Sequence, residues 1–325
     1  MINRQKKSRI RSVLKWIGWV LLVQIVLINI SAALYAYKLT HLYPSPGKDW
    51  QKAGTENFLK KTWRLFTGPR IYKVPEIELP SFAYSSVKLN ISKENSAEGW
   101  YGKTDSVAKG TVILFHAYSV SRASVLQQAN EFRYWGYNVF LVSASGHGNS
   151  NSNITTLGYH ESRDVKEACD YIQGLGEKRI ILWGASMGAV EIMKAIVDFE
   201  LKPSGIILEM PFGSLQSLLE RRARTFGFPP QPFAFLTTFW IGAERGFNGF
   251  SFNNIKYAAG IQCPVLLQYG NRDYLVPVED TKAMYDAMSS RQKKLVEYEG
   301  VDHEWLLQKN TTKWRDEVGN FLKTL

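Results

Sequence analysis

The stretch Gly184-Ala185-Ser186-Met187-Gly188 decides the fold of this chain. It follows Arg179–Trp183, a short apolar run bounded by charge that is typical of a buried parallel strand. It leads into Ala189–Val197, whose apolar spacing predicts an amphipathic helix. A serine between a strand and a helix sits on a sharp turn that presents its hydroxyl above the sheet edge. Glycines on either side leave room for strand and helix, so Ser186 is the candidate nucleophile, and the alternative is an ordinary glycine–serine turn.

The nucleophile needs partners, because a serine hydroxyl is weak at neutral pH without a base and a group that orients the base. In hydrolases with this turn the chain order is Ser, then Asp or Glu, then His. Of the five histidines only His303 follows Ser186, and it lies just after the predicted strand Lys294–Tyr298. Asp273 lies just after the predicted strand Pro264–Gly270, at the same sheet edge. We therefore expect Ser186, His303 and Asp273 to form a catalytic triad.

Two other carboxylates compete with Asp273 for the imidazole. Glu209 closes the predicted strand Gly205–Glu209 and could reach the same ring. Asp302 is adjacent to His303 in the chain and should point elsewhere. Asp273 is favoured because its loop should lie beside the histidine loop, whereas Glu209 belongs to a more central strand.

The chemistry also needs two backbone N–H groups aimed at the oxygen that becomes negative in the transition state. We expect one from Met187, directly after the nucleophile. The other should come from the loop His116–Ser119, which follows the predicted strand Thr111–Phe115.

Together these motifs resemble the α/β-hydrolase superfamily, in particular its serine-aminopeptidase-like and lysophospholipase-like esterases. The resemblance covers roughly residues 80–325. In that branch the residue after a His-Gly pair donates the second oxyanion N–H, which corresponds to Tyr118 here. The chain has Ala117 where Gly is usual, and Ser143–Ser150 keeps Gly-His-Gly and the final Ser but lacks the usual Asp and Arg. These departures concern substrate preference more than catalysis.

Alternating strand and helix patterns predict an α/β-hydrolase fold, a mostly parallel sheet with helices on both faces. An antiparallel strand over Tyr84–Ile91 opens the domain. The following strands are expected at Thr111–Phe115, Asn138–Val142, Arg179–Trp183 and Gly205–Glu209, and the helices at Ser124–Trp135, Tyr159–Gln173 and Met187–Asp198. The alternation of strands and helices stops before residue 212, and a short lid-like insertion is expected around residues 212–260. It is rich in Phe and Pro, especially over Phe226–Trp240. Its aromatic residues either line an apolar acyl site or pack the domain's own core.

The N-terminal region contains Trp16–Tyr37, 22 residues without a charge. As a helix this run spans roughly 33 Å, enough to cross a hydrocarbon core. Six Lys or Arg residues and no acid precede it, so the N-terminus should stay in the cytoplasm and the catalytic domain should lie outside. A cleavable signal peptide is the alternative, supported by Ser31-Ala32-Ala33 but disfavoured by the length of the run. A buried core helix is a third interpretation.

The expected organisation is a basic cytoplasmic tail (residues 1–15), a transmembrane signal anchor (16–37), a connector (38–80) and the catalytic domain (81–325). Residues 1–38 hold seven Lys or Arg residues and no acid, so the rest of the chain carries only +4 of the net +11. This balance gives no reason to expect nucleic-acid binding. Cys169 and Cys263 should act as small packing residues, and no metal-ligand spacing appears.

The sequence therefore predicts a membrane-anchored serine hydrolase that cleaves a carboxylic ester or related acyl bond of a small or lipid-like substrate, without a cofactor or metal. A peptidase, a thioesterase or an acyltransferase would use the same triad. A non-catalytic binding protein on a hydrolase fold is the alternative from another class, and the intact Ser, Asp and His argue against it. The oligomeric state is not predicted.

Overall fold

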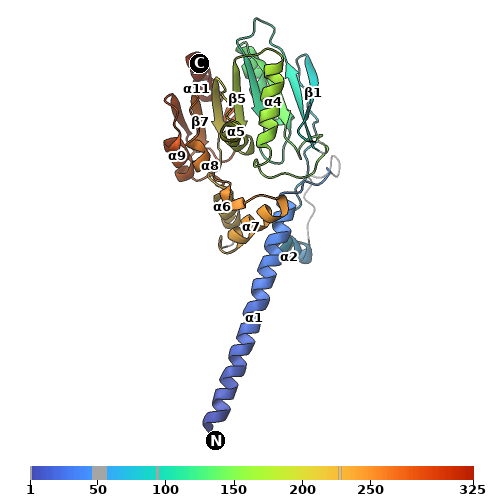
Figure 1. The fold of residues 1–325 in the computed structure, drawn as a ribbon, viewed down its shortest axis with the longest axis vertical. Helices are drawn as coiled ribbons and strands as arrows, with labels where there is room; N and C mark the ends of the chain where they lie inside the picture. Colours follow the sequence, from blue (N-terminus) through green and yellow to red (C-terminus); the bar gives the residue numbers. More distant parts are fainter. Residues whose placement is uncertain (1, 46–56, 93–94, 226, 228) are drawn as a thin grey trace.

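An eight-stranded sheet forms the centre of the catalytic domain (Figure 1). The computed structural model describes residues 2–45, 57–92, 95–225, 227 and 229–325. The strand order is β1-β2-β4-β3-β5-β6-β7-β8; β1, β2 and β4 pair antiparallel and the remaining pairs are parallel. The strands are β1 Tyr84–Asn90, β2 Ser96–Gly102, β3 Thr111–Phe115, β4 Asn138–Ser143, β5 Ile180–Ala185, β6 Gly205–Glu209, β7 Val265–Gly270 and β8 Lys293–Tyr298. The predicted mostly parallel α/β sheet is confirmed.

Helices cover both faces of the sheet because its strands are apolar on both sides. Along β3, Val112 and Leu114 join one hydrophobic cluster, while Ile113 and Phe115 join another on the opposite face. The covering helices are α3 Leu126–Tyr134, α4 Ser162–Gly174, α5 Met187–Asp198, α8 Asn254–Ala258, α9 Val278–Ala287, α10 Leu306–Lys309 and α11 Thr311–Thr324. Short 3₁₀ turns are η1 Arg122–Val125 and η2 Gly249–Ser251.

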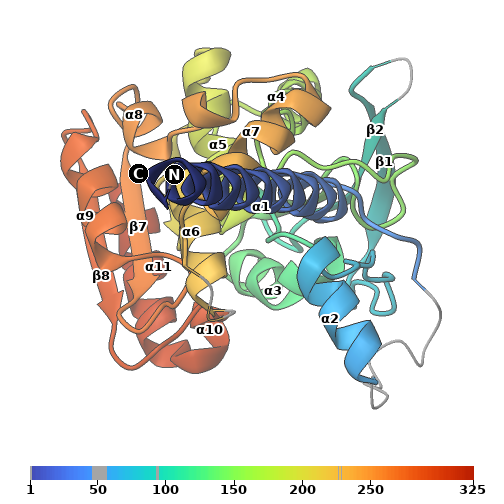
Figure 2. The ribbon, with the colours of Figure 1, turned by 90° about the horizontal axis from the view of Figure 1, so that it is seen from below.

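Two helices, α6 Leu215–Thr225 and α7 Phe233–Arg245, form a small cap below the carboxyl ends of the strands (Figures 1 and 2). They occupy the insertion expected around residues 212–260. The last turn of α7 ends at Gly246, whose left-handed conformation (φ 73°) suits a glycine. The Phe and Pro content hid these helices from the sequence pattern, since α7 carries apolar residues on both its buried and its exposed sides.

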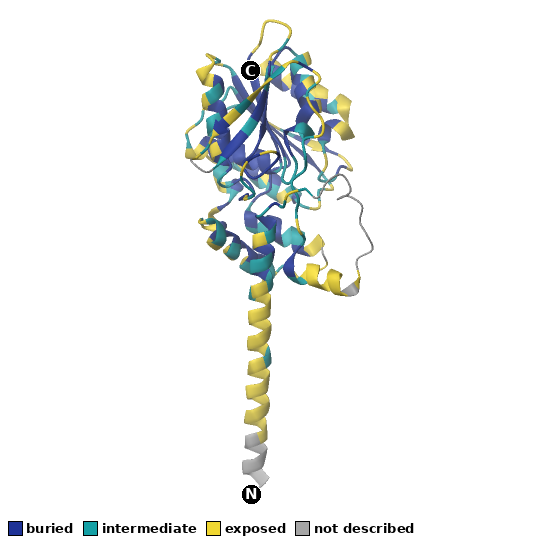
Figure 3. Cartoon of the chain, turned by 90° about the vertical axis from the view of Figure 1, so that its right-hand side faces the viewer, coloured by how far each residue is buried: buried dark blue, intermediate teal, exposed yellow. Residues whose placement is uncertain are grey.

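The N-terminal helix α1 runs over Ile2–Leu39, which is longer than the predicted span at both ends. Its part Arg9–Leu39 is long and apolar enough to cross a membrane. From Arg9 to Ile30 the helix is mostly exposed, and from Ala32 onward it packs against the catalytic domain (Figure 3). Tyr35 and Leu39 are buried there in a hydrophobic cluster shared with α6 and α7. The last turns of α1 are therefore part of the catalytic domain's own core.

A further helix, α2 Phe58–Thr67, lies in the connector and was not predicted. Its N-terminus is capped by Asn57, whose side chain accepts the backbone N–H of Lys60. It ends at Gly68 (φ 78°), where a Cβ atom would lie 2.6 Å from the ring of Tyr35. Viewed from below, α2 lies to one side of α1 (Figure 2), and it contacts α1 where that helix joins the catalytic domain.

Candidate active site

Ser186 sits on the sharp turn between β5 and α5 that the sequence predicts. Its backbone has φ 51° and ψ −108°, a strained conformation for a residue with a side chain. A Cβ atom at Gly184 would lie 2.6 Å from Gly188, and one at Gly188 would lie 2.3 Å from the carbonyl oxygen of Phe115. Both flanking positions therefore require glycine, and the strained turn holds the serine hydroxyl at the edge of the sheet.

The structure brings Ser186, His303 and Asp273 together in one hydrogen-bonded line. The Nε2 atom of His303 lies 3.0 Å from Ser186 Oγ, and its Nδ1 atom lies 2.7 Å from Asp273 Oδ2. The side chain of His303 is 15% exposed and that of Asp273 only 1%, so the base can reach a substrate while its orienting carboxylate cannot. In the neutral imidazole Nδ1–H donates to Asp273, which leaves Nε2 free to accept the serine proton.

Asp273 is held in place by its own loop. Its second oxygen, Oδ1, accepts the backbone N–H groups of Leu275 and Val276, both at 2.8 Å. Asp302 has a different task, because its Oδ1 accepts the N–H groups of Tyr274 and His303 and so ties the two loops to each other.

Glu209, the competing carboxylate, is engaged elsewhere. Its Oε1 accepts the indole N–H groups of Trp183 at 3.0 Å and Trp314 at 2.6 Å. The side chain is completely buried, and burial raises the pKa of this carboxyl to about 7, although both indoles act in the opposite direction. Glu209 therefore joins β5 to α11 under the site, and Asp273 is the carboxylate at the imidazole.

The two residues expected to supply oxyanion N–H groups lie at the ends of neighbouring strands, β3 and β5. Met187 is the first residue of α5, where an N–H group has no acceptor within the helix. Tyr118 lies in the loop after β3, the strand next to β5. The phenol of Tyr118 points to α1, where its hydroxyl donates to the carbonyl oxygen of Leu39 at 2.6 Å.

His116 fixes the loop that carries Tyr118, a role that the sequence did not reveal. The Nδ1 atom of the buried imidazole pairs with the carbonyl oxygen of Ala117 at 2.7 Å, and its Nε2 accepts the N–H of Ala144 at 3.1 Å. Burial lowers the pKa of His116 to about 4, so the ring is neutral and can play both parts at once. The ring therefore couples this loop to the end of β4.

A cavity of about 390 Å³ opens in front of Ser186 and His303. The remaining lining residues are Ala117, Val120, Ala185, Met210, Glu304, Trp305, Gln308 and Lys309. Among the described residues, the wall includes no aromatic side chain of the 212–260 insertion; Phe226 and Phe228 lie outside the described residues. The aromatic wall is instead Trp305, two residues after His303. Described aromatic residues of the insertion, such as Phe233 and Phe252, pack in the cap.

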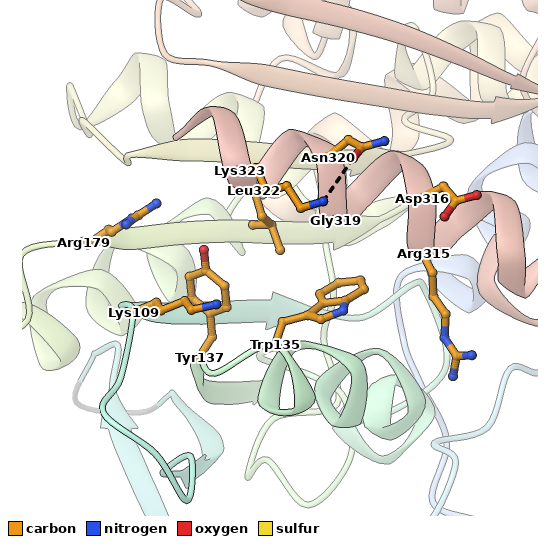
Figure 4. A pocket seen from close by; sticks show the side chains of 10 residues that line it. All are labelled: Lys109, Trp135, Tyr137, Arg179, Arg315, Asp316, Gly319, Asn320, Leu322 and Lys323. Atoms are coloured by element: carbon orange, nitrogen blue, oxygen red, sulfur yellow. Dashed lines mark hydrogen bonds between the residues drawn. The ribbon is translucent and has the colours of Figure 1, made fainter.

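A larger hollow of about 470 Å³, shown in Figure 4, lies between α11 and the amino ends of the central strands. Lys109, Tyr137 and Arg179 line it just before the starts of β3, β4 and β5, and α11 forms the other wall. Because Ser186 follows the carboxyl end of β5, this hollow does not belong to the same site.

Comparison with known proteins places the chain in a family. Residues 106–238 and 253–310 match the family described as serine aminopeptidase, S33. The match covers more than half of the chain, and the chain belongs to this family of α/β-hydrolases.

The curated relatives are distant, at 23–24% identity, and match about two thirds or more of this chain. The chain is 24% identical to the uncharacterized protein YqkD of Bacillus subtilis, over 66% of this chain and 72% of that protein. It is 24% identical to the lysophosphatidylserine lipase ABHD12 of Danio rerio, over 69% of this chain and 59% of the lipase. It is 23% identical to the uncharacterized membrane protein YNL320W of Saccharomyces cerevisiae, over 82% of this chain and 83% of that protein.

Solved structures share the fold. The esterase Pf2001 of Pyrococcus furiosus superimposes with a TM-score of 0.63 at 24% identity and covers 78% of this chain and 98% of its own. Est1E of Butyrivibrio proteoclasticus, solved with bound ferulic acid, gives a TM-score of 0.56 at 16% identity, over 73% of this chain and 99% of its own. These likenesses confirm the α/β-hydrolase fold.

Proposed function

We propose that this chain is a membrane-anchored serine hydrolase that cleaves a carboxylic ester of a lipid-like acyl compound through an acyl-enzyme. The observation that supports this proposal most is the chain of two hydrogen bonds from Ser186 Oγ to His303 Nε2 and from His303 Nδ1 to Asp273 Oδ2. Both donor–acceptor distances are in the hydrogen-bond range. A nucleophile, a base and an orienting carboxylate in this arrangement are the parts that acyl transfer needs.

In the proposed mechanism Ser186 Oγ attacks the ester carbonyl while its proton passes to Nε2 of His303. The negative oxygen of the tetrahedral intermediate accepts the N–H groups of Tyr118 and Met187. His303 then gives its proton to the leaving alcohol as the carbon–oxygen bond breaks, which leaves the acyl group on Ser186. Water attacks this ester with His303 again as the base, and the acid is released as the serine regains its proton. Asp273 holds the imidazole tautomer and stabilises its charged form.

The cavity supports an ester more than the N-terminus of a peptide. An aminopeptidase must bind the substrate's ammonium group, for which a free carboxylate is the natural partner. Among the described lining residues, Glu304 is the one carboxylate, and it is paired with Lys309 at 2.8 Å. Val120, Met210 and Trp305 give the wall an apolar character suited to an acyl chain. The names of two relatives, a lysophosphatidylserine lipase and an esterase, agree with this choice.

We also propose that the chain spans the membrane once through α1, with residues 1–15 in the cytoplasm and the catalytic domain outside. The apolar helix and the membrane-protein relative support a single-pass anchor, and the basic residues before it support this orientation. An impermeant thiol reagent on intact cells tests the orientation. A cysteine at the exposed Lys202 should react, and one at the exposed Ser12 should not. The reverse pattern would overturn the orientation.

A fluorophosphonate probe tests the proposed function. The full-length protein should form one covalent adduct, which peptide mapping should locate on Ser186 and which Ser186→Ala should not form. Because the probe reports an activated serine, it separates a hydrolase from a binding protein on the same fold. An inert Ser186 in a folded protein would refute the proposal.

A further inference from the structure

The exposed part of the uncharged run in α1 is short for a membrane span. Trp16–Ile30 is the part of the uncharged run that stays clear of the catalytic domain, and its 15 residues rise roughly 22 Å. A hydrocarbon core is about 30 Å thick. The rest of this thickness is then spanned largely by the next turns of α1, which α2 and α7 contact. A hydrocarbon core that covers the whole uncharged run therefore reaches the end of the catalytic domain from which α1 emerges.

The helix α2 has the composition of a helix that lies in such a surface. Leu59, Trp63 and Leu65 are 75%, 64% and 54% exposed, although each is a large apolar side chain. At 100° per residue they fall within one arc of the helix, while Lys60 and Lys61 fall on the other side together with Arg64. The helix contains no acid. An exposed apolar face beside a basic face is the pattern of interfacial helices that bind anionic lipid.

The position of α2 is fixed at the boundary where α1 leaves the catalytic domain. Ser31 Oγ donates to the carbonyl oxygen of Phe66 at 2.5 Å, at the last turn of α2. Two turns further along α1, Lys38 Nζ donates to Thr67 Oγ1 at 2.5 Å and to the carbonyl oxygen of Gly68 at 3.0 Å. Figure 3 shows α2, almost wholly exposed, extending sideways at the level where α1 turns from buried to exposed. A bilayer that surrounds α1 up to Ser31 therefore meets α2.

The cap adds apolar surface at the same end of the domain. Phe235 and Phe239, one turn apart on α7, are each 49% exposed, and Phe235 packs against the partly exposed Phe250 with ring centroids 4.9 Å apart. Figure 1 shows α2 and the cap helices together at the end of the domain from which α1 emerges. The triad lies at the carboxyl edge of the sheet, which is the edge that the cap covers.

We propose that α2 is a second membrane contact, an interfacial helix that binds the anionic head-group layer of the bilayer that α1 crosses. Its apolar face enters the layer and its lysines meet lipid phosphates or carboxylates. With two contacts instead of one, the catalytic domain cannot swing freely about α1, and the cavity at Ser186 is held close to the lipid surface. The consequence for lipid substrates rests on the proposed function, whereas the binding of α2 does not.

Site-specific quenching tests the contact directly. Full-length protein with Cys169→Ala and Cys263→Ala is given one cysteine at Leu59 or Trp63, or at Lys60 or Lys61 on the opposite face, and labelled with a small fluorophore. In nanodiscs of phosphatidylcholine and phosphatidylglycerol, lipids spin-labelled near the head group should quench positions 59 and 63 strongly and positions 60 and 61 weakly. Equal quenching on both faces, or none on either, would overturn the proposal.

Charge reversal tests the electrostatic part in the natural cysteine background. Lys60→Glu combined with Lys61→Glu should lower turnover of an ester embedded in anionic vesicles by at least about tenfold and leave hydrolysis of a soluble aryl ester unchanged. The matched control is Lys178→Glu with Lys202→Glu, two exposed lysines at the opposite edge of the sheet, which should change neither rate. Equal loss on both substrates, or no loss on either, would contradict the proposal. If the unmodified protein hydrolysed neither ester, the proposed function would fail and the quenching pattern alone would decide the role of α2.

Discussion

The hydroxyl of Tyr118 donates a hydrogen bond of 2.6 Å to the backbone carbonyl of Leu39. This contact joins the end of α1 to the loop after β3, which we expect to supply one oxyanion N–H group. Leu39 is also buried against the cap. The last turns of α1 are therefore a structural part of the catalytic face and not a tether attached to a complete domain.

Tyr118→Phe tests that contact. The variant loses one neutral hydrogen bond to a buried carbonyl, which is worth roughly 0.5–1.5 kcal/mol of stability. The backbone N–H remains, so we expect kcat to fall less than about tenfold while the melting temperature drops by a few degrees. Thermal melting and aryl-ester kinetics on the full-length protein provide the measurement. A loss of kcat beyond about a hundredfold would mean that the hydroxyl itself acts on the substrate.

Truncation tests whether the last turns of α1 belong to the catalytic domain. A chain that begins at residue 31 keeps Tyr35 and Leu39 and should stay folded and active on a soluble ester. A chain that begins at residue 41 loses both, and each large buried side chain contributes roughly 1.5–3 kcal/mol. We expect its melting temperature to fall by at least about 6 °C. Equal melting temperatures for the two chains would show that the contact contributes nothing.

The identity of the orienting carboxylate is tested by a matched pair of amide substitutions. Asp273→Asn keeps the shape of the side chain but favours the wrong imidazole tautomer, a change that costs about 10⁴-fold in kcat in a comparable triad. Glu209→Gln should cost tenfold at most, because Glu209 contacts two indoles and not His303. An active Asp273→Asn together with an inactive Glu209→Gln would require the two roles to be exchanged.

Glu209 should also make stability depend on pH. Burial raises its pKa from 4.5 to about 7 in the folded protein. Between these values the folded state keeps a proton that the unfolded state has released, so stability falls as pH rises from about 4.5 to 7. At 1.36 kcal/mol per pKa unit the effect is on the order of 3 kcal/mol, and Glu209→Gln should remove it. Between pH 5 and pH 8 the melting temperature of Glu209→Gln should therefore rise relative to that of the unmodified protein. A constant difference would contradict a protonated Glu209.

The fold was largely predictable, because its signals are local. The predicted strand Thr111–Phe115 is apolar from Val112 onward and is preceded by Gly110, and β3 covers the same residues. The glycines around Ser186 mark the turn for a reason visible in the structure, the 2.3 Å approach at Gly188. Position along the chain was also enough to expect that Ser186, His303 and Asp273 would meet at one edge of the sheet.

The structural features that the sequence did not predict depend on contacts between distant segments of the chain. Nothing within residues 32–39 shows that they pack on a helix near residue 240, since the same apolar residues suit lipid equally well. The helix α2 follows a segment rich in polar residues and is only 10 residues long. Its apolar periodicity therefore extends over too few residues to predict a helix. His116 and Trp305 gained their roles from neighbours across the sheet edge, which sequence spacing does not encode.

The most direct test of the account is the rate of aryl-ester hydrolysis by Ser186→Ala, with folding checked by thermal melting. The account predicts an intact fold and a loss of kcat on the order of 10⁶-fold, as for serine hydrolase triads in general. A folded Ser186→Ala protein that kept more than a few per cent of the activity would show that another group is the nucleophile.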